Sequence, residues 1–223
     1  MAKFSRMHTL GTLLDTGLVP IFYNGNAEVA LEIARAVARG GSPIVEFTNR
    51  GDGAPRVFEQ LVEGCRRELP DVIVGIGTIT DPATAALYLS LGADFVVTPT
   101  LSAEVIRVCN RRKVPVLPGC GSATEVATAE ELGCEVIKIF PGDSLGGPTF
   151  VKSVRGPAPW SSLMPTGGVS YDADSVQGWI KAGAVAVGIG SALISKDIVA
   201  QGDYDTLTER VSNVLGWVKE ARG

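Results

Sequence analysis

Lys138 is the residue whose setting in the sequence most clearly indicates chemistry. It lies inside the apolar run Val136–Pro141, whose short, β-branched pattern predicts a strand buried on both faces. Burial of an ammonium group costs several kcal/mol unless the group is paired or loses its proton. Two interpretations follow. A lysine that loses its proton is a nucleophile that can form a Schiff base, whereas a lysine at a strand's end can reach water or pair with a carboxylate.

Glu46 raises the same question, because it places a carboxylate inside the apolar run 43–47. Two opposite charges at inward-facing strand positions are either a structural ion pair or a nucleophile with its acid–base partner. We favour the second interpretation, since a structural pair in an apolar core gains little over apolar packing.

Other catalytic groups are scarce in this chain. His8 is the only histidine, and it falls in a predicted N-terminal helix, far from every predicted strand end. No set of His, Cys and acidic residues has the spacing of metal ligands, so we expect no metal and no cofactor. Chemistry must then rely on lysine, carboxylates, hydroxyls and backbone amides. The four cysteines, at positions 65, 109, 120 and 134, show no CxxC spacing and predict free thiols in a reduced cytoplasm.

The composition is that of a globular protein. Of 223 residues, 45% are hydrophobic and 20% are charged, and the formal net charge is −4. This charge and the lack of a basic block argue against a nucleic-acid partner. No apolar stretch is long enough to span a membrane, and the N-terminus lacks the pattern of a signal peptide, so we expect a cytoplasmic protein without a membrane partner.

Short apolar runs rich in β-branched residues recur along the chain, at 19–23, 43–48, 72–78, 95–99, 114–119, 136–141, 163–168 and 184–191. Helical patterns lie between them, and four of these begin after an N-cap residue: Asn26, Asp81, Ser102 or Ser122. This alternation predicts an α/β fold, a single-domain (β/α)8 TIM barrel over residues 1–223 with an N-terminal helix at about residues 4–16. The main rival is an open doubly wound sheet, but no G-x-G-x-x-G follows the first strand.

In a barrel, the active site lies where the strands end and the βα loops begin. Arg50 follows the second strand, and its fork of N–H donors suits a carboxylate or a phosphate, although a solvent-exposed loop arginine is the simpler interpretation. The last two strands end in Thr166-Gly167-Gly168 and in Gly190-Ser191. Many barrels bind phosphate there through backbone N–H groups, and glycine turns on both strands favour such a site over purely steric turns.

Together these motifs resemble a known family. The combination is Glu46-x-Thr48-x-Arg50, Gly75-x-Gly77-Thr78, Pro118-Gly119, Lys138-x-Phe140-Pro141 and Pro165-Thr166-Gly167-Gly168. In order and spacing it is similar to the 2-keto-3-deoxy-6-phosphogluconate (KDPG) / 4-hydroxy-2-oxoglutarate (KHG) aldolases. These are class I aldolases, (β/α)8 barrels that usually form trimers.

The resemblance implies a role for each matching residue. Lys138 would form the Schiff base and Glu46 would act as general acid and base. Arg50 and Thr78 would hold the pyruvate carboxylate, and Pro99 and Phe140 would shape the pocket. The phosphate would bind to the residues that follow the last two strands, which are Thr166, Gly167, Gly168, Gly190 and Ser191.

The resemblance also implies a reaction, the cleavage of KDPG to pyruvate and glyceraldehyde 3-phosphate, with KHG as a second 2-keto acid substrate that yields pyruvate and glyoxylate. The expected assembly is a homotrimer. Three loops depart from the family's commonest pattern, at 47–50, 119–122 and 140–143, and all three would line the aldehyde end of the site. Two alternatives stay open: a phosphate-sugar isomerase or epimerase, and a catalytically silent barrel that binds a phosphometabolite.

Overall fold

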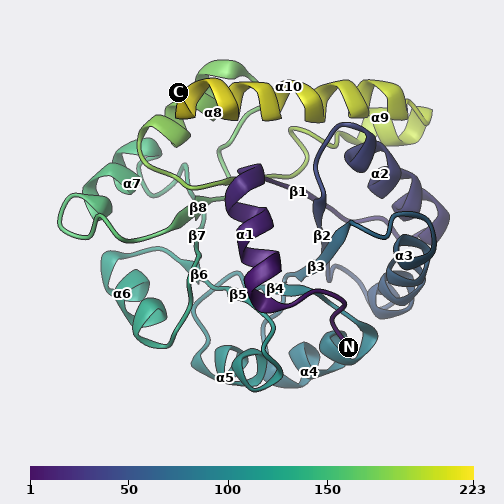
Figure 1. Cartoon of the computed structure of the whole chain (residues 1–223), viewed down its shortest axis with the longest axis horizontal. Helices are drawn as coiled ribbons and strands as arrows, with labels where there is room; N and C mark the ends of the chain where they lie inside the picture. Colours follow the sequence, from purple (N-terminus) through teal and green to yellow (C-terminus); the bar gives the residue numbers. More distant parts are fainter.

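The computed structural model describes all residues, Met1–Gly223, and Figure 1 shows a ring of helices around central strands. The strands are β1 Leu18–Phe22, β2 Ile44–Thr48, β3 Ile73–Gly77, β4 Phe95–Val97, β5 Val116–Leu117, β6 Gly119–Cys120, β7 Ile137–Ile139, β8 Leu163–Pro165 and β9 Val187–Ile189. The helices are α1 Arg6–Thr16, α2 Ala27–Arg39, α3 Ala54–Glu68, α4 Pro82–Leu91, α5 Ala103–Arg112, α6 Ala123–Glu131, α7 Pro148–Arg155, α8 Ala173–Lys181, α9 Lys196–Gln201 and α10 Tyr204–Arg222. None of these helices combines the length and the apolar character needed to cross a membrane.

The strands form two parallel sheets. One has six strands in the order β5-β4-β3-β2-β1-β9, and the other has three in the order β6-β7-β8. Each of the eight predicted runs contains strand, and Asn26, Asp81, Ser102 and Ser122 each cap a helix through the side chain. The prediction of an α/β fold built on parallel strands is therefore confirmed.

The fifth predicted strand, 114–119, differs from the prediction because it is split into β5 and β6 at Pro118. Proline has no N–H to donate to a ladder. The carbonyl of Pro118 still accepts a hydrogen bond from Lys138 N at 3.0 Å. The next residue, Gly119, donates its N–H to the hydroxyl of Thr98 at 3.3 Å instead of to a strand.

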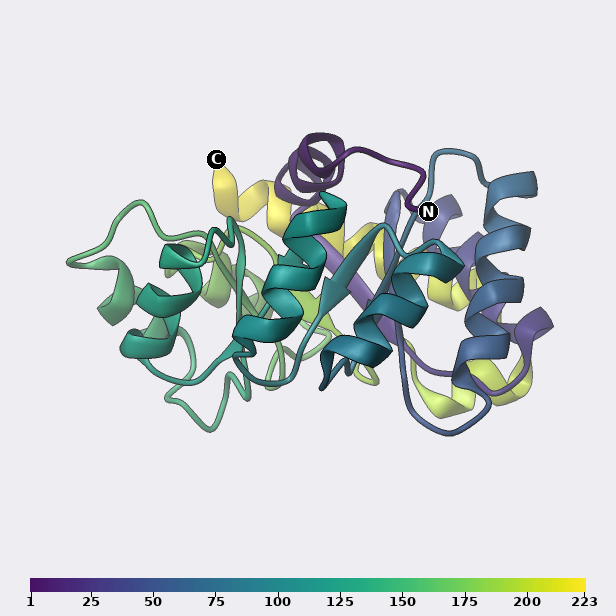
Figure 2. The same cartoon turned by 90° about the horizontal axis from the view of Figure 1, so that it is seen from below.

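Side chains from the strands of both sheets meet in a separate apolar cluster, which includes Ile44, Val136 and Met164. Leu10 and Leu13 of α1 belong to the same cluster, so α1 covers one end of it. In Figure 1 α1 crosses the middle of the ring, and in Figure 2 it lies on one side of the strands. It begins at Arg6, two residues later than predicted, because Ser5 is its N-cap and accepts a hydrogen bond from His8 N.

Side chains two residues apart on a strand share a face. Glu46 therefore points the same way as Ile44, and Lys138 the same way as Val136. Both charges thus lie on the side of the strands that carries the apolar cluster, one step beyond it and away from α1. The four cysteines are all buried and unpaired, as predicted.

Candidate active site

A cavity of about 900 Å³ opens at the carboxyl ends of the strands. Its size lies within the range of about 300–1,000 Å³ typical of small-molecule sites. The cavity is lined by every residue that the sequence predicts for the site: Lys138, Glu46, Arg50, Thr78, Pro99, Phe140, Thr166, Gly167, Gly168, Gly190 and Ser191. Residues from six different strand ends thus meet in one place, although their roles stay predictions at this point.

The two charged groups in the strands are buried but not bonded to each other. Glu46 is 1% exposed and Lys138 is 7% exposed, yet no ion pair or hydrogen bond joins them. One carboxylate oxygen of Glu46, Oε2, has no hydrogen-bond partner. The amine of Lys138 lies 4.9 Å from the centroid of the Phe140 ring. In a structural ion pair the carboxylate of Glu46 and the amine of Lys138 would contact each other. Because they do not, the geometry favours two groups that are free to contact a ligand.

Burial moves the pKa values of both groups toward their neutral forms. Desolvation raises the pKa of Glu46 above its usual value, and the charges of Lys138 and Arg50 only partly oppose this. Desolvation likewise lowers the pKa of Lys138, opposed by the carboxylate of Glu46 and assisted by the guanidinium of Arg50. The cavity therefore favours a neutral amine, which is the nucleophilic form of lysine, beside a carboxyl group that can exchange a proton.

Gly77 on the neighbouring strand β3 makes room for this carboxyl group. A Cβ atom at that position would overlap the side chain of Glu46. Strands β2 and β3 pair in register, with Thr48 opposite Gly77. The two glycines of the Gly75-x-Gly77 motif thus have steric reasons: Gly77 leaves room for the carboxyl group of Glu46, and Gly75 leaves room for the ring of Phe95.

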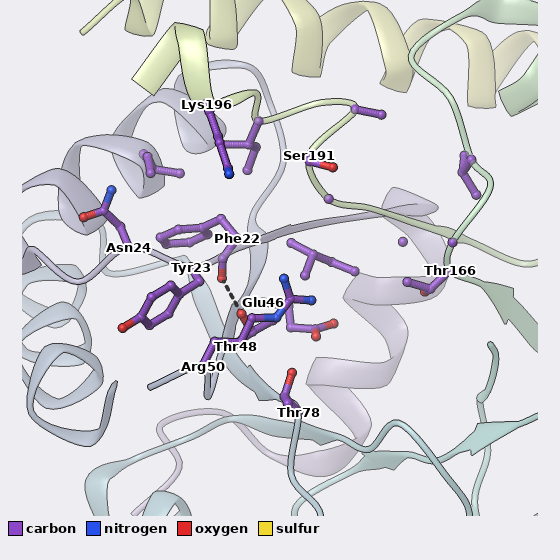
Figure 3. Close-up of a pocket in the computed structure, with 18 of the residues that line it drawn as sticks. Phe22, Tyr23, Asn24, Glu46, Thr48, Arg50, Thr78, Thr166, Ser191 and Lys196 are labelled. Carbon is purple, nitrogen blue, oxygen red and sulfur yellow. Dashed lines mark hydrogen bonds between the residues drawn. The ribbon is translucent and has the colours of Figure 1, made fainter. Parts of the chain in front are cut away.

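Arg50 reaches the cavity from a well-anchored segment. Thr48 donates its hydroxyl to Phe22 O at 3.2 Å, which ties the end of β2 to β1. The side chain of Asn49 accepts a hydrogen bond from Tyr88 Oη at 2.7 Å. The backbone N–H of Arg50 donates to Thr48 O at 2.9 Å, whereas its exposed side chain makes no ion pair or hydrogen bond within the chain. Figure 3 shows its side chain beside Glu46 and Thr48, so a free guanidinium lies next to the buried carboxyl group.

Thr78 adopts an unusual backbone conformation at the edge of the cavity. Its φ of 62° lies in the left-handed region, which is strained for a β-branched residue. Such strain persists where the surrounding structure requires one particular orientation of the residue. In Figure 3 the hydroxyl of Thr78 points toward the space beside Glu46 and Arg50.

The loops after β8 and β9 offer a set of unused hydrogen-bond donors. The backbone N–H groups of Gly167, Gly168, Gly190 and Ser191 donate no hydrogen bond within the chain. Gly167 and Gly168 have φ values of 81° and 79°, and a Cβ at Gly168 would overlap the side chain of Asp143. The hydroxyl of Thr166 is also buried without a partner. Free N–H groups gathered at one cavity suit an anion.

Further cavity residues were not among the predicted site residues. They are Ile21, Phe22, Tyr23, Asn24, Val29, Ile33, Thr48, Val169, Gly188, Ala192, Ile194, Lys196, Val199 and Ala200. Tyr23 and Asn24 follow β1, so the rule that active sites lie at strand ends would have found them had it been applied to the first strand. Lys196 begins α9, a short helix whose only sequence signal is the N-cap Ser195.

The sequence comparison decides the family. The model of the KDPG and KHG aldolase family matches residues 11–210. The chain belongs to this family. The resemblance inferred from the motifs is thereby confirmed, and with it the prediction of an aldolase.

Relatives match over nearly their whole length. A 2-dehydro-3-deoxy-phosphogluconate aldolase of Pseudomonas aeruginosa is 33% identical over 94% of this chain and 91% of its own. A KHG/KDPG aldolase of Escherichia coli K12 is 28% identical over 89% and 91%. A solved KDPG aldolase of Legionella pneumophila, with pyruvate captured at low pH as a covalent carbinolamine intermediate, superposes with a TM-score of 0.83 at 25% identity, covering 91% of this chain and 96% of that one.

The burial of Glu46 generates a prediction about stability in this family member. Folding raises the pKa of Glu46, so burying this residue costs nothing in charge at a pH below its unfolded pKa. The free energy of unfolding then falls as the pH rises from the unfolded pKa through the folded pKa. Glu46→Gln stays neutral, so we expect it to be more stable than the parent at about pH 8, with the advantage shrinking toward about pH 4, near the ordinary glutamate pKa. Urea unfolding at both pH values measures this.

The control is Glu63→Gln, which changes an exposed carboxylate on α3 and should shift the free energy of unfolding by less than about 0.5 kcal/mol. A loss of about 3–5 kcal/mol in Glu46→Gln at the higher pH would contradict the account, because that is the effect of breaking a buried ion pair.

Proposed function

We propose that this protein is a class I aldolase that cleaves KDPG to pyruvate and glyceraldehyde 3-phosphate through a Schiff base on Lys138. The observation that carries the proposal is the buried amine of Lys138, with a lowered pKa and no ion-pair partner, facing Glu46 in the main cavity. Membership of the KDPG and KHG aldolase family supports the reaction. The covalent carbinolamine in the relative from Legionella pneumophila supports an amine nucleophile.

The proposed mechanism begins when neutral Lys138 Nζ attacks the C2 carbonyl carbon of the substrate. The carbinolamine loses water and becomes an iminium ion, whose nitrogen can accept an electron pair. Glu46, directly or through water, removes the proton of the C4 hydroxyl as the C3–C4 bond breaks, and the electrons of that bond move into the enamine. The aldehyde leaves. Protonation of the enamine at C3 and hydrolysis of the imine then free pyruvate and restore the amine.

We assign the two ends of the substrate to two sides of the cavity. The free guanidinium of Arg50 and the hydroxyl of Thr78 would bind the pyruvate carboxylate, and the Phe140 ring and Pro99 would shape the space around C3. The free N–H groups at Gly167, Gly168, Gly190 and Ser191, with the hydroxyl of Thr166, would bind the phosphate. KHG remains a second, weaker substrate in this proposal, because its aldehyde half carries no phosphate.

Borohydride trapping tests the proposed nucleophile. Reduction in the presence of pyruvate should attach a pyruvyl group to Lys138, as located by peptide mass spectrometry. Lys138→Arg should fold but form no adduct, since arginine stays protonated. Labelling at another lysine, or none, would refute the proposal. A coupled assay of pyruvate release separates it from the isomerase, epimerase and silent-barrel alternatives, none of which needs an amine in β7.

The phosphate site predicts a change in substrate preference. Gly168→Ala is a poor probe, because the added methyl group would overlap Asp143. A Cβ at Gly190 meets only Ile21 O, at 3.7 Å, so Gly190→Ala should fold normally. Ser191→Ala removes a hydroxyl beside the free N–H groups, and Gly190→Ala keeps its N–H but adds a methyl group next to them. We expect each change to lower kcat/KM about tenfold or more for KDPG, the scale of one weakened or lost charge-assisted hydrogen bond, and much less for KHG. Equal losses on both substrates would show that these loops do not bind phosphate.

We also propose that residues 1–223 form one closed barrel domain. Two observations support closure: β5 and β6 are separated only by Pro118, and an isolated parallel bridge joins Thr166, after β8, to Gly188 of β9.

A cytoplasmic location is proposed from the four buried, unpaired cysteines. A homotrimer is proposed from the family resemblance, and Trp160, 73% exposed, gives it a large apolar surface group. Met164 and Trp179, in contrast, lie in the core.

A further inference from the structure

Lys196 is a cation in the cavity for which the proposed mechanism has no use. It is the first residue of α9, and it is exposed and lines the cavity. Figure 3 shows its side chain directed toward the space between Asn24, Phe22 and Ser191. No carboxylate pairs with it, and it makes no hydrogen bond within the chain. An unpaired lysine that faces a cavity is available to an anionic ligand.

The start of α9 is held in a fixed place relative to the glycine loop after β9. The N–H groups of Leu193 and Ile194 both donate to Gly190 O at 2.9 Å. Ser195 then caps α9 by accepting a hydrogen bond from Ile198 N, and the side chain of Leu193 is fully buried. The backbone of Lys196 is therefore coupled to the same turn that exposes the free N–H groups of Gly190 and Ser191.

The charges of the cavity are divided between its two sides. Its charged lining residues are Glu46, Lys138, Arg50 and Lys196. Arg50 perturbs the pKa values of both Glu46 and Lys138, whereas Lys196 perturbs neither of them. In Figure 3 Lys196 and Thr78 lie on opposite sides, with Glu46 and Arg50 between them. Among the residues that line the cavity, Lys196 is thus the one cation on the side of Ser191.

We propose that Lys196 is a specificity-determining residue that binds the terminal phosphate of the aldehyde half of the substrate. This inference rests on the proposed aldolase function and deepens it. The free N–H groups after β8 and β9 can form directional hydrogen bonds with phosphate oxygens, but a backbone N–H carries no net charge. A lysine adds a full positive charge, which distinguishes a dianionic phosphate ester from an uncharged hydroxyl at the same position. The simpler alternative is a solvated lysine at a helix start.

The test uses two aldehydes that differ only in the phosphate. Pyruvate is condensed with glyceraldehyde 3-phosphate or with unphosphorylated glyceraldehyde, and kcat/KM is measured for each. Lys196→Met removes the charge while keeping the length of the side chain, Lys196→Arg keeps the charge, and Lys219→Met is a matched control on an exposed face of α10. Glycerol 3-phosphate, which cannot react, serves as a competitive inhibitor and reports binding alone.

We expect Lys196→Met to lower kcat/KM with glyceraldehyde 3-phosphate by about 10- to 100-fold, the scale of one hydrogen bond to a charged group. The loss with glyceraldehyde should be at least about tenfold smaller, and the inhibition constant of glycerol 3-phosphate should rise in parallel with the first loss. Lys196→Arg should restore most of the preference, and Lys219→Met should match the parent. Equal losses with both aldehydes, or no loss with the phosphorylated one, would overturn the inference.

Pyruvate trapping separates this inference from the proposed function. If borohydride fixes pyruvate to Lys138 in both the parent and Lys196→Met, while the preference between aldehydes is unchanged, only the role of Lys196 is wrong. If the parent neither traps pyruvate nor condenses it with either aldehyde, the proposed function fails, and the role of Lys196 fails with it.

Discussion

The desolvation of one amine is the constraint on which this site depends. Lys138 lies in strand β7 with 7% of its surface exposed, and this burial lowers its pKa. The same burial raises the pKa of Glu46, so that neither group holds the other in an ion pair. A surface lysine would have to lose its proton at a much larger cost before it reacted. The fold therefore makes the amine nucleophilic by keeping it out of water.

Several features of the molecule follow from this arrangement. Glycine at position 77 leaves room for the carboxyl group of Glu46 between β2 and β3. The other ends of the strands carry the apolar cluster that is covered by α1, so the cavity opens only at the carboxyl ends of the strands. Free donors line the cavity, with Arg50 on the side of Glu46 and Ser191 on the side of Lys196. An extended molecule with an anionic group at each end fits these two sets of donors.

The sequence predicted much of this site, because a charge inside a β-branched run is visible without a structure, as Lys138 and Glu46 show. Strand ends and helix caps could also be located, since N-cap residues such as Asn26 and Asp81 act locally. Other features depend on neighbours that are distant in the sequence. The split at Pro118 and the left-handed backbone of Thr78 are consequences of packing. Lys196 was missed because α9 is too short to give a periodic pattern.

The most direct test of this account is the pH dependence of imine formation at Lys138. The rate of pyruvate capture in a single turnover, quenched with borohydride at each pH, follows the fraction of neutral amine. The account predicts a midpoint clearly below the ordinary lysine pKa of about 10.4, because burial disfavours the ammonium form. A midpoint at or above the ordinary value would show that Lys138 is a normally charged lysine, and would contradict the central claim.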